Sequence, residues 1–142
     1  MTSLEFNPSN QLKSLLGYTK FHSDSLVCAV LGNQYHLQKE CIHALRKLGH
    51  TPIAIPIQER TADMMRDILR TLVHHKPDML LAINHIGFDN GNTLGNLIAK
   101  CEIPTAVWYC DNPLVILGNN TIPAAEMTSI FTWEREYIPA LS

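Results

Sequence analysis

The sequence lacks the motifs that mark the common nucleotide-binding and catalytic folds. Residues 32–36 (Gly-Asn-Gln-Tyr-His) follow an apolar run, but they do not form GxGxxG, so no second glycine lets a pyrophosphate approach the backbone. No GxxxxGK[ST], GxSxG, HExxH or EF-hand pattern occurs. These absences exclude a P-loop NTPase and disfavour NAD or FAD binding at this loop. We predict no cofactor and no metal site.

Excess charge and long apolar runs are also missing. The chain has 11 Lys and Arg against 13 Asp and Glu, and its longest basic cluster is Arg46-Lys47. A nucleic-acid-binding domain usually carries a strongly basic face, so nucleic acid is not an expected partner. No apolar run approaches the ~20 residues of a membrane span. Residues 1–5 show no basic-then-apolar signal pattern, and we expect a cytoplasmic location.

The four cysteines form no CxxC pair. Cys28 and Cys110 lie in apolar, strand-like runs, whereas Cys41 and Cys101 lie on apolar helix faces. We interpret all four as reduced thiols that act as small hydrophobic residues. A metal site from Cys41 and His43 is disfavoured, because positions two apart do not share a helix face.

Apolar runs of two kinds alternate along the chain. Short runs closed by turn residues predict buried strands, at residues 25–31, 51–57, 78–83, 105–110 and 129–133. Apolar residues at three- and four-residue steps predict helices, at about 34–48, from Thr61 to about 75, and from Asn92 or Thr93 to about 101. Pro52 and Pro56 indicate that the second strand is interrupted or lies near a sheet edge.

This alternation predicts an α/β fold. We expect a Rossmann-like, doubly wound three-layer sandwich with a mainly parallel five-stranded sheet, because strands that alternate with helices form parallel sheets covered on both faces. A strand order of 3-2-1-4-5 is the expected arrangement, with the switch point between the first and fourth strands. Residues 1–24 are predicted to be a peripheral extension and residues 25–142 the Rossmann-like domain.

Polar residues follow three of the predicted strands. A parallel sheet brings these ends to one edge, where ligands bind in open α/β folds. We predict that the following residues form a binding crevice, with the loops at Gly32 and Asp111 facing each other across it: Gly32, Asn33, Gln34, His36, Asn84, His85, Asp111 and Asn112.

Structural interpretations compete with this one. Residues 111–113 (Asp-Asn-Pro) also match a simple Asx-type turn. His85 matches a half-exposed loop histidine, and His36 a solvent-facing helix residue. Trp108 matches a core residue of the fourth strand, with stacking against a substrate as the alternative.

Three segments resemble a known family. Residues 80–87 end a strand in Asn84-His85-Ile86-Gly87, residues 105–113 contain Trp-x-x-Asp-x-Pro, and residues 130–138 form a short strand that runs into a helix start. This order resembles the N-terminal domain of CgeB-like (spore-maturation-type) glycosyltransferases. The match covers residues 78–140 well and residues 25–77 at the level of the fold.

The resemblance implies the acceptor-side half of a two-domain GT-B glycosyltransferase. The C-terminal half of such a protein would bind the nucleotide-sugar and would be the partner of this domain. We therefore expect this chain to be a truncated two-domain protein that lacks that half. The partner on this half is a small-molecule or glycan acceptor. In an inverting reaction Asp111 or His85 is the candidate general base, with His36 a weaker third, whereas a retaining reaction needs no such base.

Two alternatives remain open. One is a non-catalytic Rossmann-like ligand-binding or interaction module, and the other is a stand-alone α/β enzyme, which the missing glycine motifs disfavour. An isolated half should also expose an apolar surface, so we expect self-association.

Overall fold

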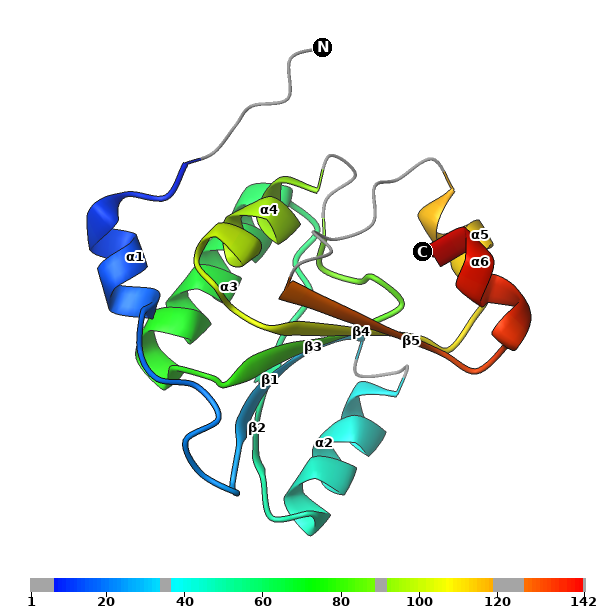
Figure 1. Cartoon of the computed structure of the whole chain (residues 1–142), viewed down its shortest axis with the longest axis horizontal. Helices are drawn as coiled ribbons and strands as arrows, with labels where there is room; N and C mark the ends of the chain where they lie inside the picture. Colours follow the sequence, from blue (N-terminus) through cyan, green and yellow to red (C-terminus); the bar gives the residue numbers. More distant parts are fainter. Residues whose placement is uncertain (1–6, 34–36, 89–91, 119–126, 142) are drawn as a thin grey trace.

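The sheet is parallel throughout and has five strands (Figure 1). The computed structural model describes residues 7–33, 37–88, 92–118 and 127–141. The strands are β1 (Val27–Leu31), β2 (Thr51–Ile55), β3 (Met79–Ile83), β4 (Thr105–Tyr109) and β5 (Thr128–Thr132). The helices are α1 (Asn10–Leu16), α2 (Gln38–Lys47), α3 (Thr61–His75), α4 (Thr93–Lys100), α5 (Pro113–Leu117), the 3-10 helix η2 (Arg135–Tyr137) and α6 (Ile138–Leu141).

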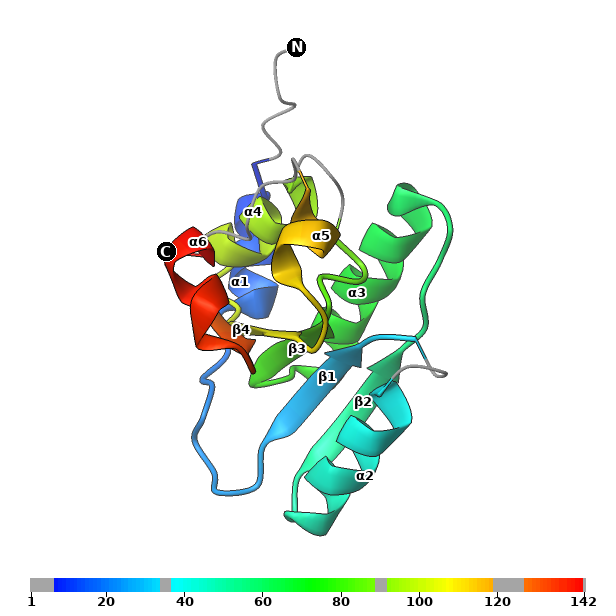
Figure 2. The same cartoon turned by 90° about the vertical axis from the view of Figure 1, so that its right-hand side faces the viewer.

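Helices lie on both faces of the sheet, as the alternating pattern predicts. Figure 2 shows β1 and β2 between α2 on one side and α3 on the other. The predicted α/β, Rossmann-like sandwich is therefore confirmed. No helix in the described ranges is both long and apolar enough to cross a membrane.

The strand order is β2-β1-β3-β4-β5, and the predicted order 3-2-1-4-5 is wrong. The chain leaves β1 through α2 to form β2, and then crosses back through α3 to place β3 on the other side of β1. The switch point therefore lies between β1 and β3. The prolines gave the correct indication, because Pro52 lies in β2, which is one of the two edge strands.

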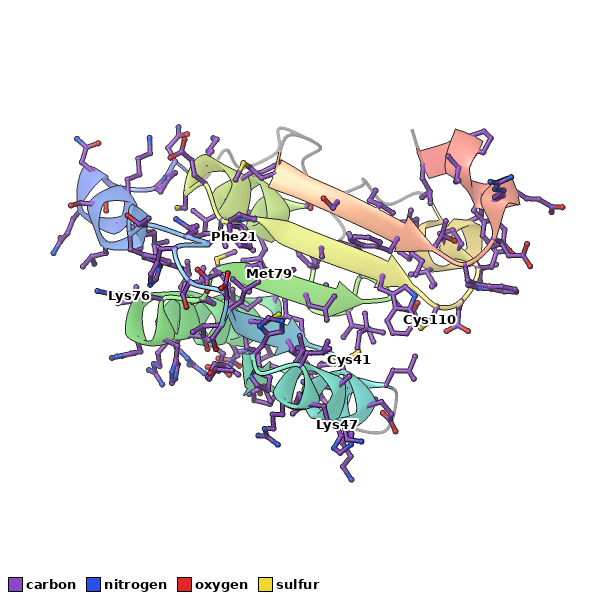
Figure 3. All side chains as sticks on the ribbon, turned by 60° about the horizontal axis from the view of Figure 1, so that its bottom comes forward. Phe21, Cys41, Lys47, Lys76, Met79 and Cys110 are labelled. Carbon is purple, nitrogen blue, oxygen red and sulfur yellow. The ribbon has the colours of Figure 1, made fainter. Side chains whose placement is uncertain are left out.

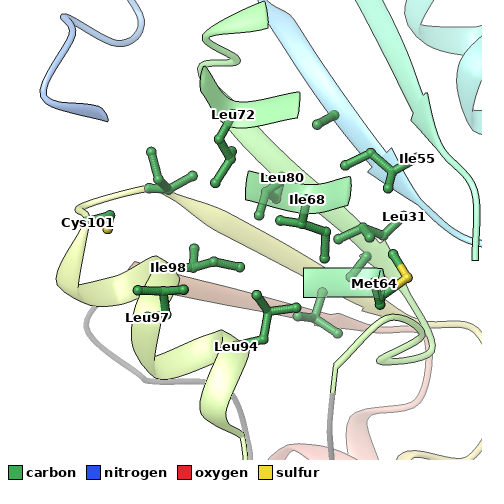
Figure 4. Close-up of a cluster of buried hydrophobic side chains, with 14 of the residues drawn as sticks. Leu31, Ile55, Met64, Ile68, Leu72, Leu80, Leu94, Leu97, Ile98 and Cys101 are labelled. Carbon is green, nitrogen blue, oxygen red and sulfur yellow. The ribbon is translucent and has the colours of Figure 1, made fainter. Parts of the chain in front are cut away.

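The main core lies between the sheet and helices α3 and α4 (Figure 4). Ile68 and Leu72 of α3 are fully buried on one face of that helix, because residues four apart return to the same face. Leu97 of α4 is fully buried as well. They pack against a sheet face that includes Leu31 and Leu80. This packing holds the carboxyl ends of the strands in fixed positions.

The segment predicted to be a peripheral extension contributes to this core. Leu16 at the end of α1 is fully buried. The Tyr18 hydroxyl donates a hydrogen bond to the Pro77 carbonyl at 2.6 Å. The buried Asp78 carboxylate accepts from the backbone N–H of Phe21 at 2.7 Å. These contacts attach residues 16–21 to the amino edge of the sheet, opposite the predicted site.

Candidate functional site

Asn84 connects the ends of β3 and β4. It follows β3 directly and has a left-handed backbone, with φ of 52°. Its Oδ1 accepts hydrogen bonds from the backbone N–H of Cys110 at 2.9 Å and of Asp111 at 3.3 Å. Its Nδ2 donates to Asp111 Oδ2 at 2.6 Å. One amide side chain therefore fixes the turn after β4 and the direction of the carboxylate that the turn carries.

Asp111 is the exposed carboxylate of this arrangement. An exposed carboxylate held by a hydrogen bond can accept a proton from a bound hydroxyl, which is the task of a general base. Cys110 precedes it at the end of β4 (Figure 3), and its Sγ lies 3.3 Å from Asn84 Oδ1. Burial raises the pKa of the Cys110 thiol, and the Asp111 charge raises it further. The thiol is therefore protonated at neutral pH.

His85 is buried, with 7% of its surface exposed. Its interpretation as a half-exposed loop residue is therefore wrong. The Tyr109 hydroxyl lies 3.4 Å from His85 Nδ1, and the Phe88 ring stacks on the imidazole with centroids 5.0 Å apart. Burial raises the pKa of Tyr109 to about 12, so its phenol is protonated at neutral pH. Which of the two groups donates the hydrogen bond depends on the tautomer of His85. His85 follows Asn84 in the chain and is held in the interior by Tyr109 and Phe88.

The loop after β1 packs closely at its first residue. Gly32 is buried, and a Cβ there would lie 3.2 Å from Ile83 Cδ1 and 3.3 Å from Gln38 Cβ. Gly32 therefore lets α2 begin close to β3. This close packing accounts for a glycine at this position without the predicted substrate contact. Asn33 is exposed at the carboxyl edge of the sheet. The predicted site residues Gln34 and His36 lie outside the described residues.

Gln38 is a buried polar residue that the sequence analysis missed. Its Nε2 donates to the carbonyls of Val30 at 3.0 Å and Ile55 at 3.3 Å, near the ends of β1 and β2. The signal was a polar residue in the first turn of a helix that packs on the sheet. Gln38 Nε2 therefore satisfies carbonyls of two neighbouring strands.

Asn112 begins a helix that the sequence analysis did not predict. Its Oδ1 accepts from the backbone N–H of Leu114 at 2.9 Å, and Pro113 is the first residue of α5. The Asn-Pro pair is a known helix-start signal. The turn interpretation of residues 111–113 therefore describes Asn112 correctly, and its side chain serves as a helix cap.

Trp108 lies in β4, in register with Ile83 of β3 and Phe131 of β5. Its neighbours Val107 and Tyr109 point into the main core, so alternation directs Trp108 to the opposite face of the sheet. It is partly buried there. The core interpretation thus holds only in part, because this face is not the main core.

Three loops meet at one edge in the order β1, β3, β4. The Asn84 loop adjoins both others, and the strand order places it between Gly32 and Asp111. The prediction that the Gly32 and Asp111 loops face each other directly is therefore wrong. Within the ranges that the structure describes, no group of three His, Cys, Asp or Glu side chains could hold a metal ion. The arrangement presents one oriented carboxylate and the exposed Asn33.

Comparison of the chain with models of known protein families and with curated proteins gives no match.

Proposed function

We propose that this chain is the acceptor-side domain of a glycosyltransferase, with Asp111 as the general base. The observation that carries the proposal is the hydrogen bond from Asn84 Nδ2 to Asp111 Oδ2 at 2.6 Å, which orients an exposed carboxylate at the edge where parallel sheets bind ligands. The resemblance of residues 78–140 to CgeB-like glycosyltransferases supports the same role.

The proposed reaction is a single inverting displacement. Asp111 removes the proton of an acceptor hydroxyl while that oxygen attacks the anomeric carbon of a nucleotide-sugar. The bond from that carbon to the phosphate oxygen breaks, and the nucleotide leaves with the electron pair. The nucleotide-sugar would be held by a second domain, as the resemblance implies.

The assignment of Asp111 as the general base can be tested by measuring sugar transfer. The measurement uses a protein that joins this chain to a donor-binding domain. We expect Asp111→Asn to lower kcat by about 100-fold or more, the range for loss of a general base, with KM for the donor little changed. Asp24→Asn, the same substitution at an exposed position before β1, is the matched control and should leave kcat unchanged. Unchanged turnover in Asp111→Asn would remove Asp111 as the base.

Acceptor binding can be measured on this chain alone. We expect simple saccharides to shift the amide NMR signals of Asn84, Cys110 and Asp111, because these residues form the turn that carries the base. The signals of Phe21 and Asp78 at the opposite edge should not move. Saccharide binding combined with an absence of transfer in the two-domain protein would favour the non-catalytic module instead.

A further inference from the structure

The outer edge of β5 is open in the described part of the chain. β5 pairs with β4 on one side, and no described strand pairs with it on the other. In Figure 1, β5 is the strand nearest to the viewer, and no helix or strand is drawn in front of it. Such an edge presents backbone N–H and C=O groups that can pair with a further strand.

The two edges of the sheet differ in how they are protected. Natural proteins protect edge strands with proline, charge or bulges. β2 carries Pro52, and Pro56 follows it directly. Residues 127–133 (Met-Thr-Ser-Ile-Phe-Thr-Trp) contain neither proline nor a charged side chain. β5 therefore lacks the features that prevent pairing at β2.

The residues around this edge expose apolar surface. Phe131 and Trp133 are 55% and 65% exposed. Aromatic side chains bury roughly 150–250 Å² each, so covering both on two copies removes on the order of 500 Å² from water. The strand backbones and the exposed Ile138 beside β5 extend this toward the roughly 1,000 Å² that a specific interface buries.

One face of β5 is already partly covered by the chain itself, at Thr132. Its Oγ1 is buried and has no hydrogen-bond partner among the described residues. It lines a small apolar hollow with Ile130, Ile138 and Leu141. A second copy would therefore join β5 through the backbone groups of its edge, and not through the Thr132 hydroxyl.

We infer that β5 pairs with β5 of a second copy of this chain, antiparallel and centred on Ile130, to form one sheet across both copies. A two-fold axis at Ile130 pairs all five residues of the strand. It places Thr132 opposite Thr128 of the second copy, so two β-branched side chains pair across the new ladder. It also places Phe131 opposite Ser129. Because residues 127–133 are uncharged, no like charges lie opposite each other within the five paired residues. The inference does not depend on the proposed function.

Sedimentation of the 142-residue chain over a range of concentrations tests the pairing. We expect a reversible monomer–dimer equilibrium. Ser129→Lys and Phe131→Glu should each weaken the dimer tenfold or more, because each places a charge in the new sheet. Ala54→Lys, at an exposed position of the other edge strand, is the matched control and should not change the equilibrium.

The double variant Ser129→Lys/Phe131→Glu tests the register. In the proposed pairing each new lysine lies opposite a new glutamate of the other copy, so the dimer should return. The pair Ser129→Glu/Phe131→Glu should remain monomeric. Circular dichroism verifies folding, since both positions are exposed. A monomer at every concentration, a dimer unaffected by the single changes, or failure of the opposite-charge pair to restore it would overturn the inference.

Discussion

At the residue scale, the candidate site depends on Asn84. Its left-handed backbone is unfavourable for most residues but is tolerated by asparagine. Its side chain makes hydrogen bonds to Cys110 and Asp111, so the conformation and the contacts support each other. His85 follows with φ of 63° and is held by Tyr109 and Phe88. Two consecutive left-handed residues therefore turn the chain at the point where the carboxylate is oriented.

We expect Asn84→Ala to lower the free energy of unfolding by roughly 1–3 kcal/mol, because the N–H of Cys110 loses its partner. Asn84→Gly removes the same side chain without the penalty for a left-handed alanine, so it should lose less. Urea unfolding measures both. If Asn84→Gly is as stable as the parent chain, the side-chain hydrogen bonds contribute nothing to stability.

At the element scale, helix starts position the loops of the site. α5 begins at the cap of Asn112 directly after Asp111, so the cap limits how far the Asp111 carboxylate can move. α2 begins beside Gly32, with Gln38 bonded to the strand carbonyls. The capping signals are local and could be read from the sequence. The role of Gln38 could not, because it depends on two carbonyls from different strands.

We expect Asn112→Ala to destabilise the protein by about 1 kcal/mol through loss of the α5 cap. Asn112→Asp retains the acceptor oxygen and should recover most of that loss. Asn96→Ala, the same substitution at an exposed interior position of α4, is the control and should change stability by less than about 0.5 kcal/mol. Thermal unfolding compares the three, and an equal effect at both positions would contradict a capping role.

At the scale of the whole molecule, buried phenols connect stability to pH. Burial raises the pKa of Tyr109 to about 12, and the pKa of Tyr18 is also raised, by burial and then by the nearby Asp78. A raised pKa in the folded state favours the protonated form. The stability from these groups is complete below their unfolded pKa of about 10 and is lost as the pH rises through the folded values.

We expect the free energy of unfolding to fall between about pH 10 and 12, with Tyr109 contributing on the order of 2 kcal/mol. Tyr109→Phe should reduce this slope, and adding Tyr18→Phe should reduce it further. Urea unfolding across this range measures the slope. An unchanged slope in the double variant would show that other groups govern alkaline unfolding.

The sequence by itself determined the fold class and the edge of the sheet at which the candidate site lies. Strand and helix periodicities are local patterns, and parallel strands must bring Asn84 and Asp111 to the same edge. Only the tertiary structure decided which loops adjoin, because strand order depends on the direction of each crossover, and both directions bury similar apolar runs. It also decided that His85 is buried and that Asn84 holds Asp111. These features arise between residues far apart in the sequence, where local patterns carry no information about the partner.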